Sequence, residues 1–293
     1  METQRKPIYK SVFFWEVLAG ALLILGLAIF LLVELQKPAP NIQETPGETL
    51  QLTEPNPPAP STEPTLPPPE KNPIGLGDFA TVNGYLTCLS TPSVLGIDVS
   101  FWQENIDWKQ VKKAGIEFAM IRAAWRGSEE GVLDTDDFAQ INYEGATKAG
   151  IKVGVYMFSQ AISVEEAIEE ANYLLNIIKD WDVEMPVVFD WEFISEDSRT
   201  GKVTARTLTD CAKAFCDTIA KAGYDPMIYF GFNHSRNMLY LAELTDYKFW
   251  LAQYNTVLNY PYKIDMWQYT ETGKVPGIEG NVDINLYFPW EED

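Results

Sequence analysis

Two acidic residues, Asp190 and Glu192, end a strongly apolar stretch of the chain. The Val and Phe residues that follow Pro186 predict a strand buried on both faces, as in a parallel sheet. Because side chains alternate along a strand, the two carboxyl groups would point the same way, with Cα atoms roughly 6–7 Å apart, and Trp191 would point the other way. Paired-carboxylate chemistry at a glycosidic bond needs acids about 5–10 Å apart. The alternative is that Asp190 only ends the strand and Glu192 is solvated in the next loop.

The chain around this pair alternates strand and helix patterns. Strands are expected over Val94–Val99, Phe118–Ala123, Lys152–Phe158, Val187–Asp190, Met227–Phe230, Phe249–Gln253, Ile264–Gln268 and Val282–Leu286. Helices are expected over Trp108–Ala114, Asp137–Ala149, Val164–Lys179 and Leu208–Ala222, with a weaker pattern over Ser235–Leu244. Repeated βα units predict parallel strands with right-handed crossovers. The predicted fold class is therefore α/β, an irregular TIM-like β/α barrel of eight strands whose last helices are reduced.

Active sites of such barrels lie at the C-terminal ends of the strands. Besides the acidic pair, that end of the predicted barrel collects acids, amides and aromatic residues, namely Asp98, Tyr156, Gln253, Trp267, Gln268 and Asp283. This composition suits a cleft that binds sugars, although each residue could instead cap a helix, tie down a loop or pack in the barrel. Arg122, in the second predicted strand, is expected to pair with an acid.

Composition divides the chain into regions. Residues 11–35 hold an apolar run long enough to cross a bilayer. Basic residues before this run place residues 1–10 in the cytoplasm by the positive-inside rule, so we expect a membrane anchor; a cleaved signal peptide is the alternative. Residues 36–73 are rich in Pro, Thr and Glu and predict a disordered linker. Residues 74–94 form a transition segment without a clear pattern, and residues 95–293 form the barrel domain.

Charge and residue usage argue against several classes of function. The formal net charge of −20 argues against nucleic-acid binding, because a basic face would carry the affinity. The sequence contains no cofactor motif and no metal-ligand cluster. The only histidine, His234, has no nucleophile-elbow motif beside it and is interpreted as structural. Cys88, Cys211 and Cys216 are expected to be free thiols, with a disulfide from Cys88 to one of the others as the alternative.

Taken together, the motifs of the domain resemble those of glycoside hydrolase family 25, the Chalaropsis-type lysozymes. The resemblance covers Leu95–Phe288 in the right order. Its motifs are Gly96–Ser100, Ile106–Trp108, Val111–Gly115, Phe118–Ala123, Gly154–Tyr156, Asp190–Glu192, Trp250–Tyr254, Trp267–Tyr269 and Val282–Asn285. Met157 departs from the pattern, since many members have His after the third-strand Tyr. This departure puts a substrate contact or a supporting hydrogen bond in doubt.

The resemblance implies hydrolysis of the β-1,4 bond between N-acetylmuramic acid and N-acetylglucosamine in peptidoglycan. Carried over by position, Glu192 would be the general acid and Asp190 its partner carboxylate, with Asp98 and Asp283 completing an acidic cleft. Glu192, kept neutral by its apolar strand and by the negative charge of Asp190, would protonate the leaving oxygen. Both outcomes at the sugar carbon stay open: retention through the acetamido group of the substrate, and inversion through activated water.

The expected partners are the glycan strands of peptidoglycan and, through residues 11–35, the lipid bilayer. No obligate protein partner is evident, and the domain is expected on the wall side of a bacterial cell membrane. Anchoring there would confine cleavage to nearby wall, which suggests remodelling. Two other functions are alternatives: a glycan-binding barrel without catalysis, and a hydrolase of another amino-sugar polymer such as chitin.

Overall fold

The computed structural model of the protein describes residues 66–233 and 237–290. The cytoplasmic N-terminus, the membrane anchor and most of the linker predicted from the sequence lie outside these residues. Within them, none of the helices has both the length and the apolarity that crossing a bilayer requires.

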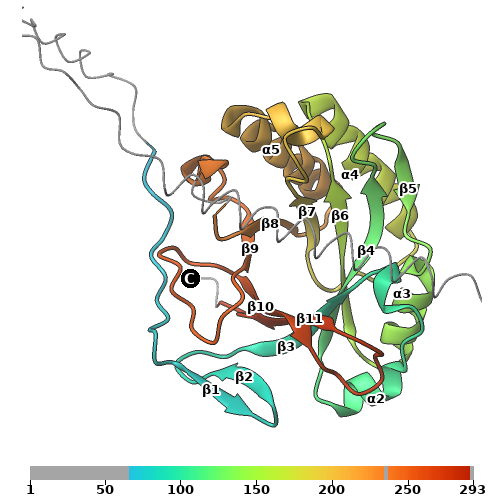
Figure 1. Cartoon of the computed structure of the whole chain (residues 1–293), viewed down its shortest axis with the longest axis vertical. Coiled ribbons are helices and arrows are strands. Elements are labelled where there is room, and N and C mark those ends of the chain that lie inside the picture. The colour runs from blue at the N-terminus through green and yellow to red at the C-terminus, as the bar shows by residue number, and fades with distance from the viewer. Residues whose placement is uncertain (1–65, 234–236, 291–293) are drawn as a thin grey trace, which may run out of the picture. The chain divides into compact units, whose positions relative to one another are not determined.

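Eight strands of the described chain form a closed barrel (Figure 1). They are β3 (Val94–Val99), β4 (Phe118–Arg126), β6 (Lys152–Ser159), β7 (Val187–Trp191), β8 (Pro226–Gly231), β9 (Lys248–Ala252), β10 (Met266–Gly273) and β11 (Val282–Tyr287). Pairing is parallel from β3 through β10. The last strand, β11, is antiparallel to both β10 and β3 and closes the ring between them. All eight predicted strands are confirmed, but the expected parallel direction is wrong for β11, because the connection from β10 is too short for a crossover.

Helices cover only part of the barrel. They are α2 (Trp108–Lys113), α3 (Ala139–Lys148), α4 (Val164–Ile178) and α5 (Ala205–Lys221), close to their predicted bounds. The side chains of Asp107, Ser163 and Thr204 cap α2, α4 and α5 by accepting hydrogen bonds from backbone N–H groups of the first turn. Part of the weaker pattern over Ser235–Leu244 lies outside the described residues, and the described part includes a 3-10 turn at Leu241–Glu243.

Three short strands of the described chain were not predicted. A hairpin of β1 (Phe79–Val82) and β2 (Tyr85–Cys88) lies in the transition segment, and its turn is the dipeptide Asn83-Gly84, a strong hairpin signal. The Phe79 ring packs edge-on against Trp267 of β10 with centroids 4.9 Å apart, so the hairpin covers an outer face of the barrel that no helix covers. The third new strand, β5 (Leu133–Thr135), pairs with the end of β4.

Alternate side chains along the strands fill the barrel interior. This inner cluster contains Phe118, Met120, Val188, Met227, Trp250 and Met266. Gly96 on β3 makes room for it, since a Cβ at this position would lie 2.3 Å from the ring of Phe118. All three cysteines are buried free thiols, namely Cys88, Cys211 and Cys216. This is the expected state, and the alternative of a disulfide from Cys88 is not formed.

Gly96→Ala is expected to lower the free energy of unfolding by about 1–3 kcal/mol. The added methyl group overlaps the Phe118 ring, which cannot move aside because the barrel interior is filled. Urea unfolding followed by tryptophan fluorescence measures this change. Gly77→Ala is the matched control, since a Cβ there meets no atom within 4 Å. A Gly96→Ala protein as stable as the control would contradict a tightly packed interior at β3.

Candidate active site

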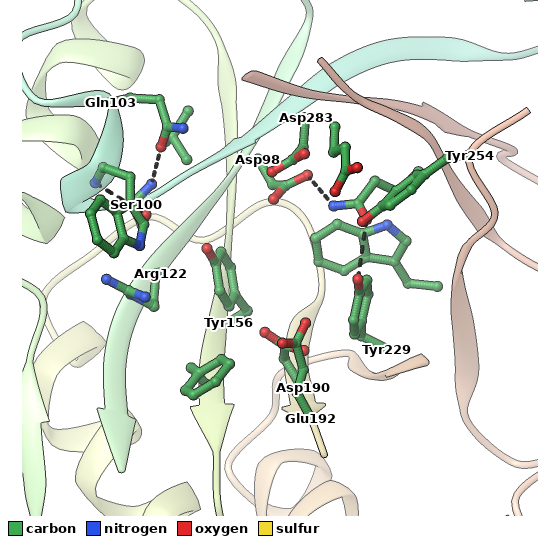
Figure 2. A pocket seen from close by; sticks show the side chains of 16 residues that line it. Asp98, Ser100, Gln103, Arg122, Tyr156, Asp190, Glu192, Tyr229, Tyr254 and Asp283 are labelled. Carbon is green, nitrogen blue, oxygen red and sulfur yellow. Dashed lines mark hydrogen bonds between the residues drawn. The ribbon is translucent and has the colours of Figure 1, made fainter. Parts of the chain in front are cut away.

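The C-terminal ends of the barrel strands surround a cleft of about 220 Å³ (Figure 2). Six of the eight site residues predicted from the sequence line it: Asp98, Tyr156, Asp190, Glu192, Gln268 and Asp283. They come from β3, β6, β7, β10 and β11 and from the residue that follows β7. The barrel therefore brings together carboxyl groups from three separate parts of the sequence, at Asp98, at Asp190 and Glu192, and at Asp283.

The β7 strand delivers Asp190 and Glu192 to the same side. Both side chains turn into the cleft (Figure 2), as the alternation predicts. Trp191 turns outward, where its indole Nε1 donates a hydrogen bond to the carbonyl of Ala161 at 3.0 Å. Asp190 is 6% exposed and its Oδ1 has no hydrogen-bond partner in the described structure, whereas Glu192 is only half-buried.

Burial raises the pKa of both carboxyl groups. The pKa of Asp190 lies well above its usual range because of burial and then because of the negative charges of Glu192 and Asp98. Burial also raises the pKa of Glu192, with a further contribution from the charge of Asp98. Asp190 is buried more deeply than Glu192, and burial favours the neutral form of both carboxyl groups. Glu192, the more exposed of the two, is the group that can reach a bound molecule.

Asp98 and Asp283 face each other across the antiparallel pairing of β3 and β11. The Oδ2 atom of Asp98 accepts hydrogen bonds from Nε2 of Gln268 at 2.9 Å and from Nδ2 of Asn285 at 2.8 Å. Burial raises the pKa of Asp98, and hydrogen bonds from Asn285, Gln268 and Asp283 oppose this rise. Burial and then the charge of Asp98 raise the pKa of Asp283 to about 8. Asp283 thus carries the proton of this pair and donates a hydrogen bond to Asp98.

A second layer of polar contacts fixes these acids. The hydroxyl groups of Tyr229 and Tyr254 donate to Oε1 of Gln268 at 3.1 and 3.2 Å, which leaves the amide nitrogen of Gln268 directed at Asp98. Nε1 of Trp250 donates to Oδ1 of Asn285 at 2.9 Å and orients that amide in the same way. Sequence reasoning missed these supporting residues. Trp250, Tyr254 and Asn285 lie within the motifs that carry the family resemblance, and Tyr229 lies near the C-terminal end of a predicted strand, so their positions were the available signal.

Arg122 is the one basic residue in the described lining of the cleft. It pairs with Asp136, between β5 and α3, with Nε and Nη2 both 2.8 Å from Oδ2. The Arg122 guanidinium also lies 4.8 Å from the ring centroid of Phe101. The expected pairing of Arg122 with an acid is confirmed. The sequence could not identify Asp136 as the partner, because several acids lie beside it in the same loop.

An aromatic platform stands beside the carboxyl groups. Trp102 lines the cleft yet is 73% exposed, and its ring centroid lies 4.3 Å from that of Phe101. A capping box formed by Ser100 and Gln103 holds this short turn. Tyr254, also in the lining, is 51% exposed. Exposed rings held in place in this way offer flat apolar faces of the kind that sugar rings stack on.

Two predicted site residues lie elsewhere. Trp267 neighbours the inward-facing Gln268 and therefore faces outward, where it is fully buried and its Nε1 donates to the carbonyl of Gln253 at 2.8 Å. The Gln253 side chain bonds to Asn259 outside the cleft. The prediction that these two residues line the cleft is corrected accordingly. Met157 is fully buried in the outer core, on the face of β6 opposite Tyr156.

Asp283 should make stability fall as pH rises. The folded protein keeps the Asp283 proton up to about pH 8, whereas the unfolded chain releases it near pH 4. The contribution of Asp283 to the free energy of unfolding is therefore lost as pH rises between these values. Asp283→Asn cannot release a proton and still offers a donor to Asp98. We expect a shallower decline in Tm between about pH 5 and pH 8 and a higher Tm than wild type at pH 8. Asp137→Asn, at an exposed position, controls for the chemical change, and identical slopes in all three proteins would contradict the protonated pair.

Comparison with known proteins places the chain in a family. The model of "Glycosyl hydrolases family 25" matches residues 97–278. Lysozyme M1 of Streptomyces globisporus is 30% identical over 67% of this chain and 68% of its own length. The uncharacterized protein YegX of Escherichia coli K12 is also 30% identical, over 67% of this chain and 70% of its own.

Solved structures show the same barrel. The bacterial lysozyme from Streptomyces coelicolor has a TM-score of 0.56 and 28% identity, over 69% of this chain and 94% of that one. The modular autolysin LytC from Streptococcus pneumoniae, solved with a synthetic peptidoglycan ligand, has a TM-score of 0.61 at 22% identity, over 73% of this chain. The match spans about half of LytC, 52% of its length. The chain thus has the mixed eight-stranded barrel of lysozyme-like enzymes and belongs to glycosyl hydrolase family 25.

Proposed function

We propose that the protein is a muramidase, which hydrolyses the β-1,4 bond between N-acetylmuramic acid and N-acetylglucosamine in peptidoglycan. The observation that carries the proposal is the cleft in which Asp98, Asp190, Glu192 and Asp283 meet at the strand ends of a family 25 barrel. The names of Lysozyme M1 and of the Streptomyces coelicolor lysozyme support it. The exposed rings of Trp102 and Tyr254 suit a polysaccharide, whose sugars have apolar faces.

In the proposed hydrolysis, Glu192 is the general acid. It gives its proton to the glycosidic oxygen while the bond from that oxygen to the sugar carbon breaks. The positive charge that develops on the sugar ring is stabilised by the surrounding carboxyl groups, of which Asp98 is the best oriented. Attack on the sugar carbon by the acetamido group retains configuration after hydrolysis, and attack by water that a carboxylate activates inverts it. Magnetic resonance of the fresh product distinguishes these two routes.

Glu192→Gln is expected to lower the rate of peptidoglycan hydrolysis by about 10²–10⁴-fold, because an amide cannot donate the proton that general acid catalysis needs. Release of reducing sugar from purified peptidoglycan measures the rate. Circular dichroism should show an unchanged fold, since the half-buried side chain keeps its size. Hydrolysis at the wild-type rate would remove Glu192 from the mechanism.

We also propose that residues 11–35 anchor the enzyme in the membrane, with the barrel on the wall side. The support is the apolar run of these residues and the basic residues that precede it. Full-length protein is expected in the membrane fraction, resistant to high salt and released by detergent, whereas a variant without residues 1–36 should leave that fraction. Recovery of the full-length protein mainly from the medium would contradict anchoring.

A further inference from the structure

One buried residue, Gln160, holds both ends of the exposed segment that follows the acidic pair. This segment, residues 193–198, leaves the barrel directly after Glu192 and returns at Arg199. Gln160 lies just beyond the end of β6 and is fully buried. Its side chain contacts the start of the segment and its backbone contacts the end.

At the start of the segment, Nε2 of Gln160 donates a hydrogen bond of 2.7 Å to the backbone carbonyl of Glu192. Glu192 lies beyond the last paired residue of β7, so the strand ladder does not fix its backbone. The Oε1 atom of Gln160 has no partner in the described structure, so the amide group serves here as a donor. The second acceptor of the same nitrogen is the carbonyl of Ser159 at 3.0 Å.

At the end of the segment, Nη1 of Arg199 donates to the backbone carbonyl of Gln160 at 2.5 Å. The same guanidinium forms a bidentate pair with Glu166 on α4, with bonds of 3.0 and 2.7 Å. Gly131 leaves room for it, since a Cβ there would lie 2.6 Å from the guanidinium carbon. The guanidinium is therefore held on several sides, and the contact with Gln160 is part of a rigid arrangement.

We propose that Gln160 and Arg199 are positioning residues, which fix the backbone of Glu192 so that its side chain enters the cleft in one orientation. The inference rests on the proposed function, in which Glu192 is the acid. Neither residue lines the cleft, so neither is expected to contact substrate. A loss of this support would let the acid move relative to the glycosidic oxygen, and a misplacement of about 1 Å can cost about 10²-fold in rate.

The test measures kcat, KM and Tm on soluble peptidoglycan fragments for wild type, Gln160→Met, Arg199→Met and Arg199→Lys. Met fills the volume of Gln without an amide donor, and its introduction also removes the unpartnered Oε1. Gln160→Met is therefore expected to lower kcat by about tenfold or more, with KM within about twofold and Tm close to wild type. Arg199→Met should lower kcat in the same way, and Arg199→Lys, which keeps a cationic donor nitrogen, should recover part of the lost kcat.

Arg206→Met is the matched control. Arg206 forms the same kind of bidentate bonds, to Asp210 and Glu243, but on the surface of α5 and outside the cleft lining. Its kcat should equal that of wild type. If Gln160→Met does not fold, the two Arg199 variants decide the matter.

Each outcome has a defined meaning. Three results would overturn the positioning role while leaving the muramidase in place. The first is an unchanged kcat in folded Gln160→Met, and the second is a rise in KM in place of a fall in kcat. The third is a loss of kcat that merely parallels the loss of Tm across all variants. If Gln160→Met does not fold, Arg199 variants with wild-type kcat overturn it equally. Absence of hydrolysis by wild type would overturn the proposed function and this inference together.

Discussion

Five carboxyl groups, those of Asp98, Asp190, Glu192, Glu271 and Asp283, line the described cleft with a single guanidinium group, and this excess of negative charge is the constraint on which the rest of the site depends. Negative charges this close together and largely removed from water could not all persist, so protons must remain in the folded cleft. Asp283 holds one beside Asp98, and burial raises the pKa of both Asp190 and Glu192, which favours their neutral forms. A site that stores protons in this way is suited to acid catalysis near neutral pH.

The barrel turns this constraint into defined geometry. Because β11 runs antiparallel to β3, Asp283 lies directly opposite Asp98 and can share a proton with it. Amide groups then satisfy Asp98, and two tyrosine hydroxyls and one indole orient those amides. Asp190 receives no such donors at Oδ1. This difference in hydrogen bonding distinguishes the two acids. Donors hold Asp98 as an oriented acceptor, whereas the absence of donors at Oδ1 favours the neutral form of Asp190.

Much of this could be predicted from the sequence, because period-2 alternation and the order of strands carry most of the information. Asp190 and Glu192 share a face for that reason, and the acids of β3 and β11 fall at the same rim. The same rule should have excluded Trp267, since adjacent residues of one strand cannot both face inward. The direction of β11 could have been read from the short connection before it, and the hairpin from Asn83-Gly84. Contacts that depend on loop paths, such as Arg122 with Asp136 or Gln160 with the backbone of Glu192, have no local pattern in the sequence.

In the proposed function, this cleft cleaves the bond that leaves N-acetylmuramic acid at the new reducing end. The most direct measurement is mass spectrometry of purified peptidoglycan digested with the protein and then reduced, so that each new reducing end is labelled on its own sugar. We expect labelled N-acetylmuramic acid ends with wild type and about 10²–10⁴-fold fewer with Glu192→Gln in the same digestion time. Labelled N-acetylglucosamine ends would contradict the bond assignment. No new ends with wild-type protein would contradict the hydrolase itself and favour a glycan-binding barrel or an enzyme for another polymer.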